Sequence, residues 1–565
     1  MGSLSNYVFK FYNHFNLSII GMLLMILIML KQIHIIQLNS YNLDQQIIWY
    51  KRNVKSYLLN IVLLAVVILI PLLSFLLYYF FGNAMQSGQN STAPFWTVSI
   101  LLYLMLLLAP ILLLAMLIEN LPRKQKKKLV FTKRILRLIL ITLLMYAIWF
   151  IIAFKLKSLS SIWFVLFGVA ICHLLVFVAY LITLPIENSI RKKFMNEAKA
   201  IIDANSDLCV IGITGSFGKT SVKFYLDSIL KAKYSVCKTP ESFNTAMGAT
   251  LTIKNDLRNI DDIFICEMGA RRIGDIKEIC DIVSPSGAII TDVGNMHLDT
   301  FRSIENVLNT KFELVEAATH NRRSGKFGEI PILVNGDNEL IRKKVIEAFG
   351  ITEQSNIKYY GFGKENTFYA DNIVASEKGT RFRFNSKEFG SEEFETRLLG
   401  KYNIMNLVAA ISYSLILGID VLTIKNAVKN IEPVPHRLQI LPYGTNDFII
   451  DDAYNSNPMG ARNAVDVLSS FEGYIKVIIT PGMVELNDKQ DEENEKFAEY
   501  AGDKVDYAIV VGGTNKIALN KGFEKTLSKD KLFNIERVED AIKYAMTNIS
   551  GKKVILLEND LSDNY

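Results

Sequence analysis

Long apolar runs in the first 185 residues constrain this chain more than any other feature of its sequence. A helix that crosses a bilayer needs about 20 mostly apolar residues, because an unpaired backbone group in hydrocarbon costs several kcal/mol. Four segments meet this requirement, and a fifth segment near the start, which contains Lys31 and His34, meets it less fully. The five predicted spans are residues 16–37, 57–82, 94–118, 134–154 and 160–185.

The charges between these spans predict their orientation. Basic loops lie on the cytoplasmic side of a membrane, whereas the uncharged stretch GNAMQSGQNSTAP between the second and third spans suits the outside. With five spans, the chain leaves the last span on the cytoplasmic side, so everything after Pro185 is predicted to be cytosolic. The basic residues behind this prediction are Lys51, Arg52, Lys55, Arg123, Lys124, Lys126, Lys127, Lys128, Lys133, Arg134 and Arg137.

The apolar block is predicted to be a multi-pass anchor in the cell membrane. No small-residue cleavage site follows the first segment, so the block is expected to stay in the mature protein. Buried ionisable residues would favour a channel or transporter, but only His173 lies well inside a confident span. A lone histidine there usually makes a helix–helix hydrogen bond, although an ATP-driven transporter or flippase remains an alternative.

The net charge and the cysteine spacing argue against a nucleic-acid-binding protein and against a cysteine-based metal site. The formal net charge is +6, but the densest basic run lies between two apolar segments, so no nucleic-acid partner is expected. The chain has five cysteines, without a C-x-x-C pair or a histidine at metal-ligand spacing. Reduced, buried cysteines of a cytosolic protein are therefore predicted.

From Asp207 onward, short apolar runs alternate with amphipathic helices, which predicts a parallel α/β sheet. The first strand, LCVIGIT, runs into GSFGKTS and then into a helix with apolar residues at helical spacing. Glycines let the backbone wrap phosphate oxygens, Lys219 neutralises the β and γ phosphates of ATP, and Thr220 ligates Mg²⁺. The other residues predicted to bind phosphate are Gly215, Ser216, Gly218 and Ser221.

Five further motifs follow this loop in order. They are ESFNTAMGATLT from Glu241, FICEMGA ending at Ala270, TDVGNMHLDTF from Thr291, LGKYNIMN from Leu399 and IIDDAYNSNP from Ile449. Together with the loop GITGSFGKTS, in which Ile213 stands where a phosphate loop usually has glycine, they resemble the Mur ligase family. The resemblance is strongest to the branch that adds D-alanyl-D-alanine to the peptidoglycan precursor, the UDP-N-acetylmuramoyl-tripeptide ligases.

This resemblance implies a multi-domain protein and a reaction. After the α-helical transmembrane bundle of residues 1–185 and a basic helical linker of residues 186–206, an α/β P-loop central domain is expected at residues 207–433. An α/β Rossmann-like C-terminal domain is expected at residues 434–565, with strands in IKVIIT, DYAIVVG and KKVILLE. The implied enzyme is an ATP- and Mg²⁺-dependent ligase: a carboxylate takes the γ-phosphate of ATP, and an amine displaces phosphate to leave an amide.

The resemblance also implies roles for single residues. Glu267 and His297 match positions that hold metal together with Thr220, and Lys311 matches a lysine that is carbamylated in many Mur ligases. Asn403 and Asn406 match asparagines beside the adenine, although Tyr402 replaces the usual histidine of that motif. Arg437 matches a nucleotide-contacting arginine that usually follows glycine but here follows His436. One residue of the pair Asp451 and Asp452 is expected to meet the ribose.

The substrates are expected to differ from those of soluble Mur ligases. Those enzymes begin with a domain that binds the UDP end of the precursor, and here the apolar block stands in its place. The acid is therefore predicted to be a lipid-linked or other membrane-held cell-envelope precursor, and the amine an amino acid or dipeptide. A polyglutamate-type synthase and a non-catalytic membrane scaffold that kept the nucleotide fold are the remaining alternatives.

Overall fold

The computed structural model describes residues 2–39, 41–86, 108, 110–121, 128–155, 159–241, 243–294, 298–321, 327–350, 356–376, 379–443, 447–454, 457–484, 486 and 489–560. The chain divides into two compact units, Met1–Arg191 and Lys192–Tyr565, which are described separately. The domain limits predicted at residues 185, 206 and 433 stay predictions. All five cysteines are free and buried, as expected.

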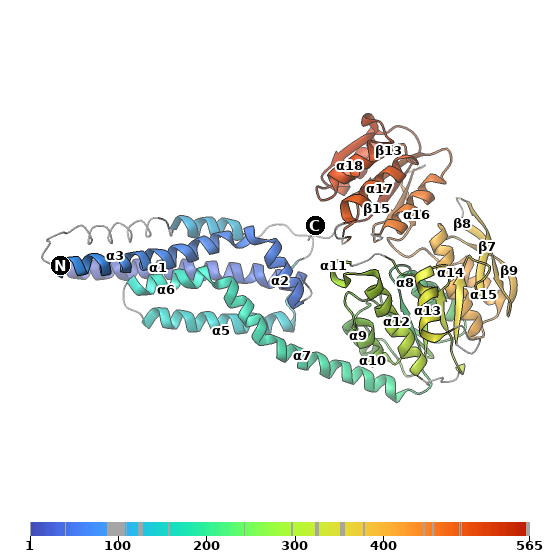
Figure 1. Ribbon diagram of the computed structural model, residues 1–565, viewed down its shortest axis with the longest axis horizontal. Helices are drawn as coiled ribbons and strands as arrows, with labels where there is room; N and C mark the ends of the chain where they lie inside the picture. Colours follow the sequence, from blue (N-terminus) through green and yellow to red (C-terminus); the bar gives the residue numbers. More distant parts are fainter. Residues whose placement is uncertain are drawn as a thin grey trace. The chain divides into compact units, whose positions relative to one another are not determined.

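The first unit is a bundle of apolar helices in which α6 packs against α1, α3 and α5 (Figure 1). Leucine and isoleucine fill its interior, but many also remain exposed on its outer surface, for example Leu69, Ile111 and Leu140, each at least 59% exposed. A water-soluble bundle would bury such residues. The helices are α1 (Gly2–Leu38), α2 (Leu43–Arg52), α3 (Leu58–Gln86), α5 (Lys133–Lys155), α6 (Leu159–Ala170) and α7 (Cys172–Ala204).

Within the described part of this unit, three helices are long and apolar enough to cross a membrane. They are Ile19–Leu38, Lys133–Ala153 and Cys172–Ala204, and the shorter apolar helices Leu58–Ile70 and Pro110–Asn120 accompany them. The start of the predicted span at residues 94–118 and most of the uncharged loop before it lie outside the described residues. The number of membrane crossings stays a prediction.

The segment 160–185, predicted as one span, contains two helices in the structure, and its single crossing of a membrane stays a prediction. Helix α6 ends at Ala170 and α7 begins at Cys172, and α7 then continues without interruption past Pro185 to Ala204. The Asn60 amide of α3 compensates for the lost helical bonds: its Nδ2 donates to the Val169 carbonyl (3.0 Å), and its Oδ1 lies 3.1 Å from His173 Nε2. A helix break is tolerated where polar side chains from a neighbouring helix satisfy the freed backbone groups.

The second unit begins with a nine-stranded sheet in the order β2-β3-β1-β4-β5-β6-β7-β8-β9. Its strands are parallel from β2 to β7, and the residues of β1, β3, β4 and β5 are buried on both faces, as the apolar runs predicted. The strands are β1 (Cys209–Thr214), β2 (Val236–Lys238), β3 (Ile263–Met268), β4 (Gly287–Ile290), β5 (Ile332–Asn335), β6 (Ile357–Gly361), β7 (Phe368–Ser376), β8 (Gly379–Ser386) and β9 (Gly390–Thr396).

Helices cover both faces of this sheet (Figure 1). One face packs against α8, α14 and α15, and the other against α9, α10, α12 and the end of α7, so the domain has three layers. The helices are α8 (Lys219–Leu230), α9 (Ala246–Asn255), α10 (Asp275–Val283), α11 (Leu298–Phe301), α12 (Ile304–His320), α13 (Glu339–Phe349), α14 (Lys401–Ile416) and α15 (Val421–Lys429).

A six-stranded sheet follows in the order β10-β11-β15-β12-β13-β14, with only β10 antiparallel. Three helices cover one face and α19 the other. The strands expected in IKVIIT, DYAIVVG and KKVILLE are present as β12, β13 and β15. The elements are β10 (Gln439–Tyr443), β11 (Asp447–Asp452), α16 (Pro458–Ser469), β12 (Ile475–Thr480), α17 (Gln490–Gly502), β13 (Tyr507–Val511), α18 (Lys516–Phe523), β14 (Leu532–Ile535), α19 (Val538–Asn548) and β15 (Lys553–Glu558).

A buried acid ends the central strand of this second sheet. The Glu558 side chain is fully buried, one of its oxygens accepts a hydrogen bond from the Thr480 hydroxyl, and the other has no hydrogen-bond partner among the described residues. Burial raises the pKa of Glu558 from 4.5 to about 8. The folded protein therefore holds a proton that the unfolded chain releases at lower pH.

Replacing Glu558 with glutamine is expected to remove a loss of stability at alkaline pH. Because the folded pKa lies above the unfolded one, stability is full below about pH 4.5 and falls as the pH rises toward 8, by roughly 5 kcal/mol at most. Chemical unfolding of the wild type and of Glu558→Gln at several pH values checks this, with the exposed Glu536→Gln as the control. The same pH dependence in Glu558→Gln and the wild type would contradict the assignment.

Candidate active site

The phosphate loop joins β1 to α8 and is held close to the loop after β4. Ser216 N donates to the Asp292 carbonyl (2.6 Å), and Gly294 N donates to Ser216 Oγ (3.1 Å). A Cβ atom on Gly215 would lie 2.0 Å from Thr291 Oγ1, so a side chain at this position would force the two loops apart. These contacts with the loop after β4 fix the backbone of the predicted glycine loop, and a loop of this kind before a helix can bind an anion.

Gly218 brings this loop close to helix α14. It has a left-handed backbone (φ +79°), and a Cβ atom there would lie 2.4 Å from Asn406 Oδ1. Lys219 follows at the first position of α8, where the helix dipole favours negative charge. The loop, the helix N-terminus and Asn406 thus meet at one place.

The Lys219 ammonium group is folded over the loop. Its Nζ donates to the carbonyl oxygens of Gly215 (2.8 Å) and Ser216 (3.1 Å). Loss of contact with water lowers the pKa of Lys219 to about 8, although the neighbouring Glu267 carboxylate partly opposes this shift. Phosphate oxygens would restore the charged form, because an anion nearby favours the ammonium ion.

Thr220 and Glu267, two of the residues predicted to hold a metal ion, are in contact. Thr220 Oγ1 donates to Glu267 Oε1 (3.0 Å), and Glu267 is 1% exposed at the end of β3. Burial alone would raise the pKa of Glu267, but the ammonium groups of Lys223 and Lys219 bring it below its ordinary value. An ionised carboxylate beside a hydroxyl is an oxygen donor set that Mg²⁺ accepts, so these residues fit the ion.

His297 lies outside the described residues, and its predicted metal role stays a prediction. Lys311 lies on α12 and is 3% exposed. Burial lowers the pKa of Lys311 to about 7, and the positive charge of Lys219 contributes to the same shift. A buried lysine that is largely neutral near physiological pH can react with carbon dioxide, which is the property that carbamylation needs.

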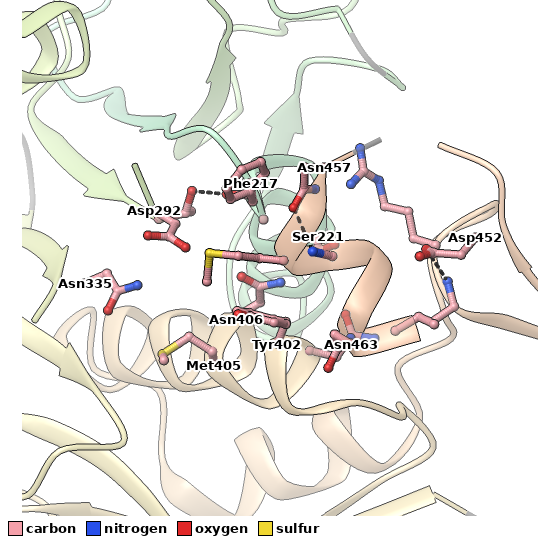
Figure 2. A pocket seen from close by; sticks show the side chains of 17 residues that line it. Phe217, Ser221, Asp292, Asn335, Tyr402, Met405, Asn406, Asp452, Asn457 and Asn463 are labelled. Atoms are coloured by element: carbon pink, nitrogen blue, oxygen red, sulfur yellow. Dashed lines mark hydrogen bonds between the residues drawn. The ribbon is translucent and has the colours of Figure 1, made fainter. Parts of the chain in front are cut away.

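A cavity beside the phosphate loop collects most of the residues predicted to bind the nucleotide. Figure 2 shows side chains of the phosphate loop, α14 and the start of α16 around this cavity. Of the predicted residues, it is lined by Gly218, Ser221, Asn403, Asn406, Arg437 and Asp452. It is also lined by Phe217, Thr291, Asp292, Asn335, Tyr402, Met405, Leu438, Asn457, Met459, Gly460 and Asn463.

The structure distinguishes between the two neighbouring aspartates. Asp452 lines the cavity, and its Oδ1 accepts a hydrogen bond from Leu438 N (3.1 Å). Asp451 instead accepts a hydrogen bond from His436 Nδ1 (2.7 Å). Asp452 is therefore the better candidate for contact with a ribose, whereas Asp451 stabilises the loop before Arg437.

The loop before Arg437 keeps a glycine-like backbone although it contains a histidine. His436 has a left-handed φ of +60°, a conformation that costs a non-glycine residue some energy. Its bond to Asp451 and the Tyr454 ring at 4.8 Å hold it there. Arg437 consequently reaches the cavity wall.

Two family models match the chain. The model of the Mur ligase middle domain matches residues 213–413, and the model of the Mur ligase, glutamate ligase domain matches residues 436–558. The chain belongs to the Mur ligase family. Mur ligases are ATP-dependent enzymes that form amide bonds, and both matched regions lie after the N-terminal helices.

Eight curated relatives of this Mur ligase carry the name UDP-N-acetylmuramoyl-tripeptide–D-alanyl-D-alanine ligase. The protein from Bacillus subtilis (strain 168) is 28% identical over 351 residues, which is 62% of this chain and 72% of the relative. The protein from Escherichia coli (strain K12) is 28% identical over 277 residues, 49% of this chain and 58% of the relative. With several of these relatives, the match thus spans less than two thirds of their length.

Solved structures support the same fold. MurF from Acinetobacter baumannii superposes with a TM-score of 0.57 at 24% identity and covers 66% of this chain and 77% of that one. The MurF ligase from Thermotoga maritima in complex with ADP gives 0.56 at 24% identity, covering 66% and 80%. At this identity the likeness shows the fold of the Mur ligase domains.

One buried residue of this Mur ligase site was not predicted. Lys223 lies on α8, one turn after Lys219, and its Nζ is 2.9 Å from Glu267 Oε2. In the sequence it sits beside Val222 in an amphipathic helix, where a lysine is ordinarily exposed. The only sequence signal was its spacing of one helical turn from the phosphate-loop lysine, which places both on one side of the helix.

Proposed function

We propose that this chain is a membrane-bound ligase that joins a carboxylate of a cell-envelope acid to the amino group of an amino acid or dipeptide. The observation that carries the proposal is the meeting of Lys219, Thr220 and Glu267 beside a cavity lined by Asn406 and Asp452. This arrangement offers cationic, hydroxyl and carboxylate groups to the phosphate end of ATP and polar groups to its nucleoside end.

The reaction has two balanced steps. A carboxylate oxygen of the acid attacks the γ-phosphorus of ATP, and the bond to the β-phosphate oxygen breaks to release ADP. The amine then attacks the acyl carbon of the acyl phosphate, loses a proton, and displaces inorganic phosphate. Negative charge accumulates around the γ-phosphate in the first step, where the Lys219 ammonium group and the α8 N-terminus stabilise it.

The metal would be held by Thr220 and Glu267. A bound Mg²⁺ supplies positive charge that neutralises the phosphate oxygens. Glu267 remains ionised because of its lysine neighbours and is therefore ready to hold a cation. A carbamate on Lys311 would add a further anion on α12, near Lys219.

The N-terminal helices support a membrane-held acid. Helix α7 ends at Ala204 and β1 begins at Cys209, so no further domain stands between these apolar helices and the ATP site. Ala198 and Ile202, near the end of α7, are part of the core of the catalytic unit. We propose that the helices cross the membrane with the catalytic domains in the cytoplasm, and that the acid is a lipid-linked precursor of the peptidoglycan type.

A competition between acceptors tests this proposal. The full-length protein in lipid nanodiscs is given ATP, Mg²⁺, a panel of amino acids and D-alanyl-D-alanine, and either a lipid-linked or a UDP-linked muramoyl peptide. We expect an amide product, identified by its mass, mainly on the lipid-linked acceptor and none with Lys219→Ala. Preference for the UDP-linked acceptor would contradict the proposal that the acid is lipid-linked. Absence of an amide with every pair of substrates would contradict the proposed ligase activity. Repeated addition of glutamate would indicate a polyglutamate-type synthase.

A further inference from the structure

A buried ion pair lies directly behind the candidate metal site. Lys223 Nζ is 2.9 Å from Glu267 Oε2, and the two side chains are 0% and 1% exposed. Removing two charges from water costs several kcal/mol each, and a buried pair recovers this only with good geometry and further hydrogen bonds. Because burial of the two charges is costly, we ask what this ion pair does besides joining α8 to β3.

The other oxygen of the same carboxylate faces the phosphate loop. Glu267 Oε1 accepts hydrogen bonds from Thr220 Oγ1 (3.0 Å) and Asn244 Nδ2 (3.3 Å). Lys223 Nζ instead lies against Oε2 as an ion pair, so the lysine and Thr220 contact opposite oxygens of one carboxylate. The two oxygens that would hold the metal, Thr220 Oγ1 and Glu267 Oε1, thus lie together while the lysine contacts the other carboxylate oxygen.

Lys223 also anchors the loop between β2 and α9. Its Nζ donates to the Glu241 carbonyl oxygen, and Glu241 has a left-handed backbone (φ +37°). The same loop supplies Asn244, whose carbonyl oxygen accepts a hydrogen bond from Gly269 N (2.6 Å). One ammonium group therefore joins α8, the end of β3 and the loop that covers Glu267.

We infer that Lys223 is a positioning residue for the Mg²⁺–ATP site: by binding Glu267 Oε2 and the Glu241 carbonyl, it holds Glu267 Oε1 toward Thr220. The inference rests on the proposed function, since it takes Thr220 and Glu267 as the metal-holding pair. It predicts that the loss of Lys223 raises the Mg²⁺ concentration needed to bind ATP, and that this effect requires Glu267. A lysine that merely stabilised the fold would leave the Mg²⁺ dependence unchanged.

Four variants test the inference: Lys223→Met, Glu267→Gln, the double variant, and Lys238→Met as a matched control. Lys238 is a neighbouring lysine that pairs with Asp227. The Mg²⁺ concentration for half-maximal binding of a fluorescent ATP analogue is measured, so that the readout does not require amide formation. Phosphate release and the thermal unfolding midpoint are followed in parallel.

Lys223→Met is expected to raise this Mg²⁺ concentration about 10-fold, as the loss of residues that orient metal ligands commonly does. In the Glu267→Gln background the same change should shift it less than about 2-fold, because its partner is already gone. Lys238→Met should match the wild type.

An unchanged or lower Mg²⁺ requirement in Lys223→Met, or an equal shift in both backgrounds, would overturn the inference. If Lys223→Met does not fold, the double variant is compared with Glu267→Gln alone, because it leaves no unpaired buried charge. A difference between those two would likewise overturn the inference. Wild type that binds Mg²⁺–ATP but forms no amide would reject the proposed function without affecting this test.

Discussion

Replacing Lys219 with alanine is expected to lower the rate of ATP-dependent amide formation by about 1,000-fold or more. Lys219 is the first residue of α8, and its ammonium group donates hydrogen bonds to the loop carbonyls of Gly215 and Ser216. In this variant, the γ-phosphate lacks the ammonium group that would stabilise its negative charge during transfer to the acid. Release of phosphate in the presence of both substrates measures the effect.

A lysine at the other end of the same helix provides the control. Lys231 follows the last turn of α8, is half exposed and pairs with Asp227. Lys231→Ala removes one charge of the same kind but should keep the wild-type rate, because Lys231 lies at the opposite end of α8 from the phosphate loop and Asp227 keeps its second partner, Lys238. Equal rates for Lys219→Ala and the wild type would reject the role of this loop in catalysis.

Replacing Lys311 with arginine is expected to lower the rate about 100-fold or more, because arginine keeps the positive charge and cannot form the carbamate. Burial brings the pKa of Lys311 to about 7, so much of the amine is neutral at that pH. The neutral amine attacks carbon dioxide, forms a carbon–nitrogen bond and releases a proton, which leaves a carbamate anion. The fraction of carbamate should therefore fall as the pH drops below about 7.

Isotope-labelled bicarbonate checks this directly. The wild type should incorporate the label as a carbamate seen by carbon NMR, and Lys311→Arg should not. The label should leave the wild type as the pH is lowered, together with activity. Full activity of Lys311→Arg, or a wild type without the label, would contradict the carbamate.

The phosphate loop and its strands could be predicted because their information is local. The strand, the glycines and Lys219 are consecutive in the sequence, and the structure places them as the spacing predicted. The same holds for the three C-terminal strands, whose apolar runs are short and bounded by turns. Motifs far apart, such as those of Asn406 and Asp452, could be assigned to one cavity only through the family resemblance.

Other features depend on contacts between distant segments and were not predictable from local pattern. Residues 160–185 divide into α6 and α7 beside Asn60 from another helix, a contact that the local apolar pattern does not reveal. Asp451 and Asp452 are adjacent and chemically identical, and only the folded structure separates them, by the His436 contact of Asp451 and the cavity position of Asp452. The burial of Lys223 depends on Glu267, which is distant in the sequence and lies beside it at the end of β3.

The transfer of an oxygen atom tests the central claim most directly. The protein, ATP, Mg²⁺ and the amine are incubated with an acid substrate whose carboxylate oxygens carry a heavy isotope. The mass of the released phosphate is then measured by mass spectrometry. If the acid is phosphorylated and then captured by the amine, each amide formed should be accompanied by one phosphate that carries one heavy oxygen. Phosphate without the label would show that ATP is hydrolysed by water, and the chain would not be working as a ligase.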